Sequence, residues 1–313
     1  MDNKKISFRE KLARKYNTDM PYTMQKGKFL FAFILCLPAV VGLCVWYIGV
    51  NAQSIAMAFQ DPQTNEFSLV NFERLLNEMS REDSEIYIAL INTFKYFIMG
   101  AFIIPVVTYF IAYYLYLRIK FSKFFLLILH LPNILSGVVV AAMIKSITSP
   151  VGPISTIMNK IGLGLMPNLF GQPETATKAL LTIVFFLGLN TNVLLWIGTF
   201  KRIPREVSEA AKLDGATEMQ ELFQIVTPMV STTAVTLFIL GCTGIFTASG
   251  PILYYTGGGA DTNTLSFWIF NQTYNGALLN YPAAVGIFFT FIGIPIVLFL
   301  NWLANKIAKQ VEY

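Results

Sequence analysis

The clearest candidate for a functional surface is residues 202–230, RIPREVSEAAKLDGATEMQELFQIVTPMV, a charged stretch in an otherwise apolar chain. The sequence shows no acid–base pair, metal cluster or activated nucleophile that would indicate a catalytic site. The stretch instead combines charged side chains with the small residues Ala210, Ala211, Gly215 and Ala216, which let another protein surface come close. This pattern favours docking to a partner. An ordinary connector between two membrane spans is the alternative.

Local signals predict two short helices in this stretch, joined at Gly215. Pro204 suits the first helical position, and Glu206 lies in the first turn, where a negative charge is favourable. Gly215 can adopt the left-handed conformation that ends a helix. Thr217, with Gln220 three residues later, is typical of a capping box that opens a second helix.

A second group of residues could bind a solute inside the membrane. Transporter sites lie near the bilayer midplane, and a sugar needs hydrogen-bonding side chains and flat aromatic faces. Glycines in the same segments would leave space for the solute. Polar residues in spans also join helices to one another, and this is the alternative role. The candidates for the solute path are Asn133, Asn190, Thr191, Asn192, Trp196, Gly241, Thr243, Gly244 and Thr247.

The elements that carry these residues are predicted to be membrane-spanning helices. Hydrophobic residues make up 55% of the 313 residues and charged residues only 13%, against about 25% charged in soluble domains. A span needs about 20 apolar residues. We therefore expect an all-α polytopic membrane protein with six spans, the first of them a retained helix and not a cleaved signal peptide. The six apolar runs are 29–50, 87–117, 124–148, 178–200, 229–250 and 282–303.

The distribution of Lys and Arg predicts the orientation of these spans. Seventeen basic residues fall on the side that holds both termini, and four on the other side. Because Lys and Arg favour the cytoplasmic side, both termini should be cytoplasmic. The net charge of +5 is then a sign of topology and does not indicate nucleic-acid binding. The predicted organisation is a basic N-terminal segment (1–27), a first span with an acidic outer loop (28–86), a transmembrane core (87–305) and a C-terminal tail (306–313).

The charged stretch resembles the EAA motif of ABC importer permeases. That motif reads Glu-Ala-Ala, three residues, Gly, nine residues, Ile, any residue, Leu, Pro. The chain departs from it at Thr227, where Leu is usual. The form of the motif in carbohydrate permeases is similar to IPREVSEAAKLDGA in this chain. Three further segments resemble other parts of these permeases: INTFKYF, LPNILSGVV and residues 256–286. In the last of them Ala260 stands where Pro is common. The likeness covers roughly residues 28–305 and is greatest to MalF-like subunits. The motif positions matched are Glu209, Ala210, Ala211, Gly215, Ile225 and Pro228.

This resemblance implies a type I ABC importer transmembrane fold and a set of partners. Two permease subunits, here two different chains of the MalF and MalG kinds, would form one path in the lipid membrane. Two ATPase subunits would bind ATP and Mg, and an extracellular binding protein would deliver a carbohydrate. The resemblance makes Glu209, Ala210, Ala211, Asp214 and Gly215 the coupling positions. The chain has no G-x-x-x-x-G-K-[ST] phosphate loop, so this chain would be a non-catalytic subunit of a bacterial cell-membrane complex.

Three alternatives remain at this point. An ABC importer for a non-sugar solute would carry the same coupling motif. A secondary transporter or channel often places acidic residues within its spans, and none lies deep in the six runs. A membrane-embedded enzyme is disfavoured because no catalytic constellation is recognisable. Copurification of an ATPase would separate the importers from the other two classes.

Overall fold

A computed structural model describes residues 22–117, 120–247, 249–276 and 278–308. Within these residues the regular structure is helical, and the one β feature is a bridge between Gln60 and Phe67. The predicted N-terminal segment lies mostly outside the described residues, as does the C-terminal tail beyond Ala308. The chain divides into two compact units, residues 1–56 and 57–313, each of which is described by itself.

The described part of the first unit, from residue 22 on, forms one long apolar helix. Helix α2 (Tyr22–Gly42) continues through the π-helical turn η1 (Leu43–Gly49) into α3 (Val50–Ala58), whose last two residues belong to the second unit. Its large apolar side chains are exposed from Leu30 onward, including Trp46 at 71%. A helix that is hydrophobic on all sides is typical of a membrane span. This helix covers the first predicted span.

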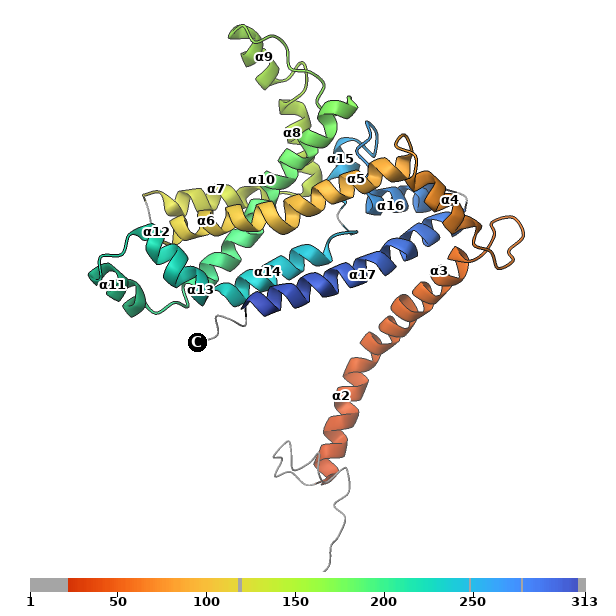
Figure 1. Cartoon of the computed structure of the whole chain (residues 1–313), viewed down its shortest axis with the longest axis horizontal. Coiled ribbons are helices and arrows are strands. Elements are labelled where there is room, and N and C mark those ends of the chain that lie inside the picture. Colours follow the sequence, from red (N-terminus) through yellow and green to blue (C-terminus); the bar gives the residue numbers. More distant parts are fainter. Residues whose placement is uncertain (1–21, 118–119, 248, 277, 309–313) are drawn as a thin grey trace, which may run out of the picture. The chain divides into compact units, whose positions relative to one another are not determined.

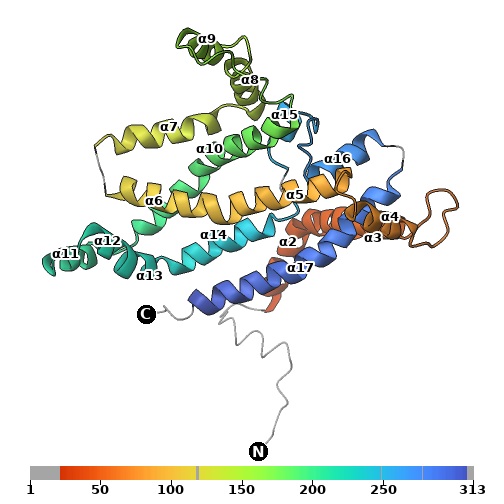
Figure 2. The ribbon, with the colours of Figure 1, turned by 45° about the horizontal axis from the view of Figure 1, so that its top comes forward.

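Long helices form the body of the second unit (Figures 1 and 2). Helix α5 (Glu85–Ile98) continues through η2 (Met99–Ile103) into α6 (Ile104–Tyr116), which packs against α10 (Pro173–Phe200). Helix α14 (Ser231–Thr243) lies between η2 and α17 (Asn280–Ala308). Apolar side chains from these helices and from shorter ones beside them form four clusters of buried residues in the described part of the unit.

The structure confirms several helices that are long and apolar enough to cross a membrane, but two predicted spans are not straight. Among the described residues four helices are long and apolar enough to span, or up to six if two bent pairs each count as one span. Helix α7 (Ser122–Ile134) meets α8 (Gly137–Ile147) at 105°. Leu135 and Ser136 are extended there, and the Ser136 hydroxyl accepts a hydrogen bond from the Val139 N–H, so it starts a new helix.

The fifth predicted span, 229–250, differs more from the structure. The segment 218–229 meets α14 at 72°, with the bend at Val230, and α14 itself ends at Thr243. Residues 244–247 form turns. The hydropathy of this run predicted where an apolar helix lies in the sequence. It did not predict the bend at Val230, because the direction of a helix depends on packing as well as on composition.

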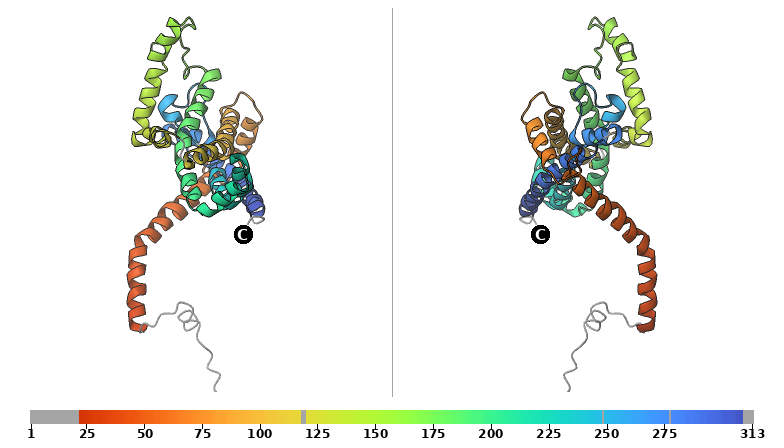
Figure 3. Two further views of the ribbon diagram at one scale, coloured as in Figure 1. Left: turned by 90° about the vertical axis from the view of Figure 1, so that its left-hand side faces the viewer. Right: turned by 90° about the vertical axis from the view of Figure 1, so that its right-hand side faces the viewer.

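Short helices occupy the segments between spans that the sequence treated as loops. They are α4 (Val70–Met79), α9 (Pro153–Lys160), α15 (Ile252–Tyr255) and α16 (Leu265–Asn275). Helices α4 and α16 pack on α17 and α5 through a cluster that includes Trp268 and Tyr281. In Figures 1 and 3 the yellow-green segment of α8 and α9 projects away from these packed helices.

Two side chains of the INTFKYF segment hold the turn before α16. The Asn92 amide donates to the carbonyl oxygens of Asp261 (2.7 Å) and Asn263 (3.0 Å). The Thr93 hydroxyl accepts from the Leu265 N–H at 2.8 Å and donates to the Ala89 carbonyl. Both side chains are buried. These bonds fix a turn whose backbone is unfavourable for ordinary residues.

Ala260 and Asp261 have positive φ values of 53° and 52°. An L-residue pays roughly 1–2 kcal/mol in this left-handed region. Proline cannot adopt this conformation because its ring fixes φ near −65°. The proline that the resembled permeases commonly have at this position would therefore not fit the turn of this chain.

We predict that Ala260→Gly stabilises the protein by about 1 kcal/mol, because glycine adopts a positive φ without steric cost. Thermal unfolding of the detergent-solubilised chain would show a higher midpoint. Ala142→Gly is the control: Ala142 is exposed within α8, so glycine there should lower the midpoint. A fall for both variants would contradict the left-handed turn.

Candidate functional site

The charged stretch forms a two-helix element at one end of the second unit, at the opposite end from α4 and α16 (Figure 1). It contains α11 (Arg205–Leu213), α12 (Glu218–Gln220), the π-helical turn η3 (Glu221–Val226) and α13 (Thr227–Met229). Pro204 is the N-cap of α11 and not its first helical residue. The predicted pair of helices joined at Gly215 is confirmed.

Backbone hydrogen bonds around Gly215 end α11 in a Schellman motif. The Gly215 N–H donates to the Lys212 carbonyl at 3.1 Å, and the Ala216 N–H donates to the Ala211 carbonyl at 3.0 Å. Gly215 has a φ of +78°, which the motif requires at this position. No atom lies within 4 Å of a Cβ placed on Gly215, so only the backbone conformation restricts this residue.

The predicted capping box opens the second helix. The Thr217 hydroxyl accepts from the Gln220 N–H, and the Gln220 side chain accepts from the Thr217 N–H at 2.8 Å. Two donors that a helix start leaves unpaired are thereby satisfied. The direction of the chain between α11 and α12 is therefore fixed on both sides of Gly215.

Four of the five predicted coupling residues are exposed on this element: Glu209, Ala210, Asp214 and Gly215. The fifth, Ala211, is 5% exposed. Leu213 is 89% exposed although it is apolar. Small and apolar groups thus stand at the surface beside charged ones, a combination suited to a close contact with another protein.

A buried carboxylate ties α11 to the helix that follows. Glu221 is 2% exposed, and the Ser208 hydroxyl donates to its Oε1 atom. The Tyr113 hydroxyl of α6 donates to the Glu218 carbonyl at 3.3 Å. Tyr109, also on α6, hydrogen-bonds the Thr227 hydroxyl at 2.6 Å. The two-helix element is therefore attached to α6 by side chains on both sides of η3.

An aromatic cluster lies beneath these hydrogen bonds. Tyr109 of α6 packs edge-on against Trp196 of α10, with 4.9 Å between ring centroids, and Trp196 stacks on Phe200 at 5.9 Å. Such pairs are worth about 0.5–1.5 kcal/mol beyond their buried area. The cluster joins α6, α10, η3 and α14, and its other buried members are Ala112, Tyr113, Val193, Leu222, Val226, Val230 and Leu237.

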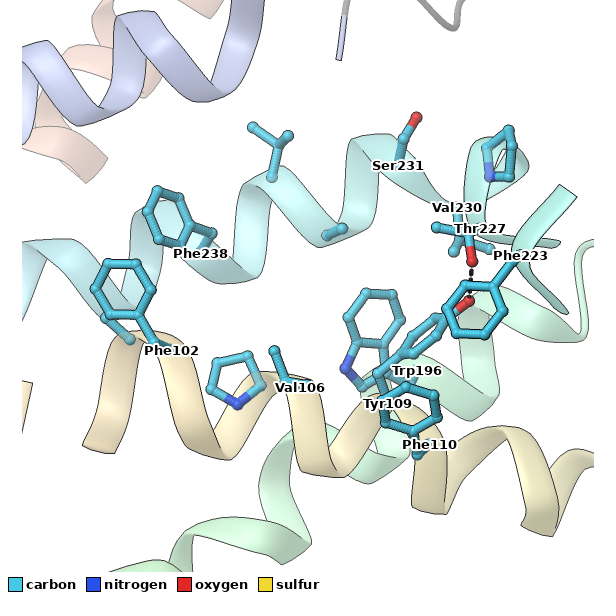
Figure 4. Close-up of a pocket in the computed structure, with 15 residues that line it drawn as sticks. Phe102, Val106, Tyr109, Phe110, Trp196, Phe223, Thr227, Val230, Ser231 and Phe238 are labelled. Atoms are coloured by element: carbon cyan, nitrogen blue, oxygen red, sulfur yellow. Dashed lines mark hydrogen bonds between the residues drawn. The ribbon is translucent and has the colours of Figure 1, made fainter. Parts of the chain in front are cut away.

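A pocket of about 550 Å³ opens beside this cluster, between η2–α6 and α13–α14. Figure 4 shows Phe102, Val106 and Phe238 along it, with Trp196 and the Tyr109–Thr227 hydrogen bond at one end. Its lining is almost entirely apolar, with few groups that could hydrogen-bond a sugar. Trp196, a predicted path residue, is only 3% exposed and belongs to the aromatic cluster.

The other predicted path residues differ in their exposure. Asn190 is buried in α10, Asn192 is half-buried, and the side chain of Thr191 lies outside the described residues. Asn133 is exposed near the end of α7. The two glycines, Gly241 and Gly244, are half-buried. A Cβ on Gly241 would come within 2.8 Å of the Ala101 Cα, so Gly241 serves close helix packing.

Thr243 and Thr247 are exposed. Helix α14 carries two further exposed threonines, Thr232 and Thr236, which are not among the predicted path residues. Thr232, Thr236, Leu240 and Thr243 follow one another at intervals of four, four and three residues, which places them on one face of α14. The hydroxyls of Thr236 and Thr243 donate to carbonyls of the same helix. The spacing of the threonines in the sequence indicates this face. We call it the α14 threonine face.

The two lysines within predicted spans make specific contacts. Lys95 donates to the Asn92 amide oxygen at 3.3 Å and lines a pocket of about 640 Å³ with Glu174 and Lys178. Lys145 of α8 donates to the Tyr255 carbonyl at 3.1 Å, at the end of α15. Within the described residues no three His, Cys, Asp or Glu side chains gather as they would around a metal ion.

Comparisons with known proteins place this geometry in context. Residues 110–313 match the family described as "Binding-protein-dependent transport system inner membrane component". The chain is 25% identical to the "Probable ABC transporter permease protein YurN" of Bacillus subtilis (82% of this chain, 89% of the relative). It is 26% identical to the "Multiple sugar-binding transport system permease protein MsmF" of Streptococcus mutans (69% and 72%).

A solved structure shares the fold. It is a chain of a "bacterial alginate ABC transporter in complex with alginate pentasaccharide-bound periplasmic protein", with a TM-score of 0.79 and 21% identity over 92% of this chain and 97% of that chain. This likeness confirms the predicted type I importer transmembrane architecture.

We predict that Ser208→Ala loosens α11, because it leaves the buried Glu221 carboxylate without this hydrogen bond. An unpaired buried acceptor costs about 1–3 kcal/mol, so amide exchange of α11 should rise about tenfold. Hydrogen-exchange mass spectrometry would measure it. Ser146→Ala, at an exposed position of α8, is the control. Unchanged exchange in α11 of the Ser208 variant would argue against this tie.

Proposed function

We propose that this chain, which belongs to the family of binding-protein-dependent transport system inner membrane components, forms half of the translocation path of an ATP-driven carbohydrate importer. The similarity to a permease named for sugar transport and to a structure of an alginate importer supports a carbohydrate solute. An importer for a non-sugar solute is the alternative, and a secondary transporter is a more distant one.

The observation that carries this proposal is the exposed two-helix element between α10 and α14. Ala210 and Gly215 leave room at its surface, and Leu213 offers an exposed apolar side chain. We assign this element as the coupling helix, which docks on a separate ATPase subunit. That subunit would bind ATP and Mg, and this chain would be non-catalytic.

The packing beneath the element supplies a route for the movement. When the ATPase subunits close, a displacement of α11 would pass through the Ser208–Glu221 hydrogen bond into η3. It would then reach α6 and α10 through Tyr109, Tyr113 and the aromatic cluster. A densely packed cluster transmits such a displacement because it cannot compress. The path would thereby alternate between inward-facing and outward-facing forms.

The complex would contain a second, different permease subunit, two ATPases and an extracellular binding protein. It would lie in the bacterial cytoplasmic membrane with both termini of this chain in the cytoplasm, as the Lys and Arg distribution indicates. The coupling element would then also be cytoplasmic.

The α14 threonine face is our candidate for this chain's wall of the solute path. Polar side chains exposed at membrane depth usually face a water-filled cavity or another protein. Thr236 and Thr243 keep free oxygen lone pairs that can accept hydrogen bonds from sugar hydroxyls. Asn133 and Asn192 are further candidates from α7 and α10.

The proposal is tested by purifying the chain from its native membrane and identifying what accompanies it. An ATPase and a second permease should copurify, and reconstituted liposomes should take up carbohydrate when ATP and the binding protein are present. A chain that transports without an ATPase would make a secondary transporter the better description.

We predict that Gly215→Asn retains the ATPase whereas Gly215→Val loses most of it. Asn tolerates the left-handed conformation, but a β-branched residue does not. Because a Cβ meets no atom there, the difference reports the backbone turn alone. Ala210→Glu, on the exposed face of α11, should also lose the ATPase by blocking close approach. Pull-down of the ATPase measures all three, and equal retention would contradict the assignment.

We predict that Thr236→Val and Thr243→Val raise the KM for the transported carbohydrate about tenfold each, because each removes one hydroxyl that pairs with the solute. ATP-dependent uptake into liposomes measures this. Thr290→Val is the matched control, since Thr290 is exposed on α17 and also donates to its own helix. A KM that changes as little for the α14 variants as for this control would exclude the threonine face from the path.

A further inference from the structure

The largest of the pockets described here lies at the same end of the unit as the coupling element and is not explained by transport. It measures about 890 Å³ and lies between the end of α6, the start of α7 and the end of α10. Its lining differs from that of the apolar pocket in Figure 4, because it contains two ammonium groups, from Lys123 and Lys201, and two hydroxyl groups, from Tyr116 and Ser122.

The charged side chains that line this pocket, among the residues that the structure describes, are those of Lys123 and Lys201, and none of these lining residues carries a carboxylate. Among the described residues, no Asp or Glu oxygen lies within 4.0 Å of the ammonium group of Lys123 or Lys201, whereas Arg74 and Arg81 each have such a partner. Two unpaired cations at one pocket attract an anion.

The start of α7 adds to the positive potential. Phe121, the residue before the helix, has a φ of 66° and no side chain caps the helix there. The first-turn N–H groups of a helix carry partial positive charge and bind anionic oxygens. Ser122, Lys123 and Phe124 of this turn all line the pocket. The uncapped helix and the two lysines therefore favour the same kind of ligand.

The rim of the pocket is suited to a lipid. Phe121 and Phe124 are 74% and 57% exposed, and both line the pocket. Helix α7 begins a membrane span, and its next exposed side chains include Phe125 and Leu127. A ligand with a phosphate group in the pocket would thus have acyl chains beside exposed apolar side chains. Basic pockets between transmembrane helices bind anionic lipid headgroups in this way.

We propose that this pocket binds the phosphate of an anionic phospholipid, held by Lys123, Lys201 and the first turn of α7. Lys201 directly follows α10, and Ile203, in the same lining, lies two residues before α11. The lipid would therefore connect α7 to the base of the coupling element. The proposal does not depend on which solute is transported.

Lipid binding by the purified full chain, measured by native mass spectrometry, tests this. Dioleoylphosphatidylglycerol is titrated against dioleoylphosphatidylcholine with the wild-type chain and with Lys123→Gln, Lys201→Gln and Lys306→Gln. Lys306, at the end of α17, is the control because its removal changes the charge equally outside the pocket. A melting temperature in phosphatidylcholine shows that each variant is folded.

The wild-type chain should bind one phosphatidylglycerol in preference to phosphatidylcholine. Lys123→Gln and Lys201→Gln should each weaken that binding about tenfold, because each removes one hydrogen bond to a charged group. Lys306→Gln should leave the binding unchanged. Lys123→Arg, which keeps the positive charge, should retain most of the affinity for phosphatidylglycerol. Equal binding by all three Gln variants would mean general surface attraction and would overturn the site. Displacement of the lipid by millimolar inorganic phosphate would overturn its assignment to a lipid.

Discussion

The aromatic cluster between α6 and α10 is the interaction on which the rest of this chain depends. Tyr109, Trp196 and Phe200 join the two helices, and Leu222 and Val226 join η3 to the same cluster. Because the second helix of the charged element is part of this core, the element is not an independent loop. Under the proposed function, a force on its exposed half would reach this packed interior and, through it, α6 and α10.

The two halves of this element differ in their exposure and in their contacts. Helix α11 keeps small and apolar groups at its surface, and its Ser208 hydroxyl donates to the buried Glu221 of η3, in the other half of the element. The segment from α12 to α13 is buried on one side and hydrogen-bonded to Tyr109 and Tyr113. The left-handed Gly215 turns the chain between the exposed half and the anchored half.

The sequence predicted the local features of this element well, because their bonds join near neighbours. Gly215 and the Thr217–Gln220 pair act over three to five residues, so the residue types alone indicate them. Hydropathy likewise located the spans. The bends at Val230 and at Ser136 were not predictable, since tertiary packing decides the direction of a bend.

Long-range contacts account for the remaining differences. Asn92 reaches carbonyls about 170 residues away, and no local pattern indicates that partner. Trp196 has both an apolar face and a polar N–H, so its type fits a sugar path and an aromatic core equally. Its packing against Tyr109 and Phe200 favours the core. Exposure of successive threonines on α14 becomes visible only when the neighbouring helices are placed.

The most direct test of the central claim is a photocrosslink from Leu213, the exposed apolar residue at the end of α11. A photoreactive amino acid at this position would be activated in native membranes, and the attached protein would be identified by mass spectrometry. We expect the attached protein to be an ATPase that contains a G-x-x-x-x-G-K-[ST] phosphate loop. A crosslink only to lipid, or only to proteins that do not bind ATP, would contradict the claim that this element couples ATP hydrolysis to the membrane path.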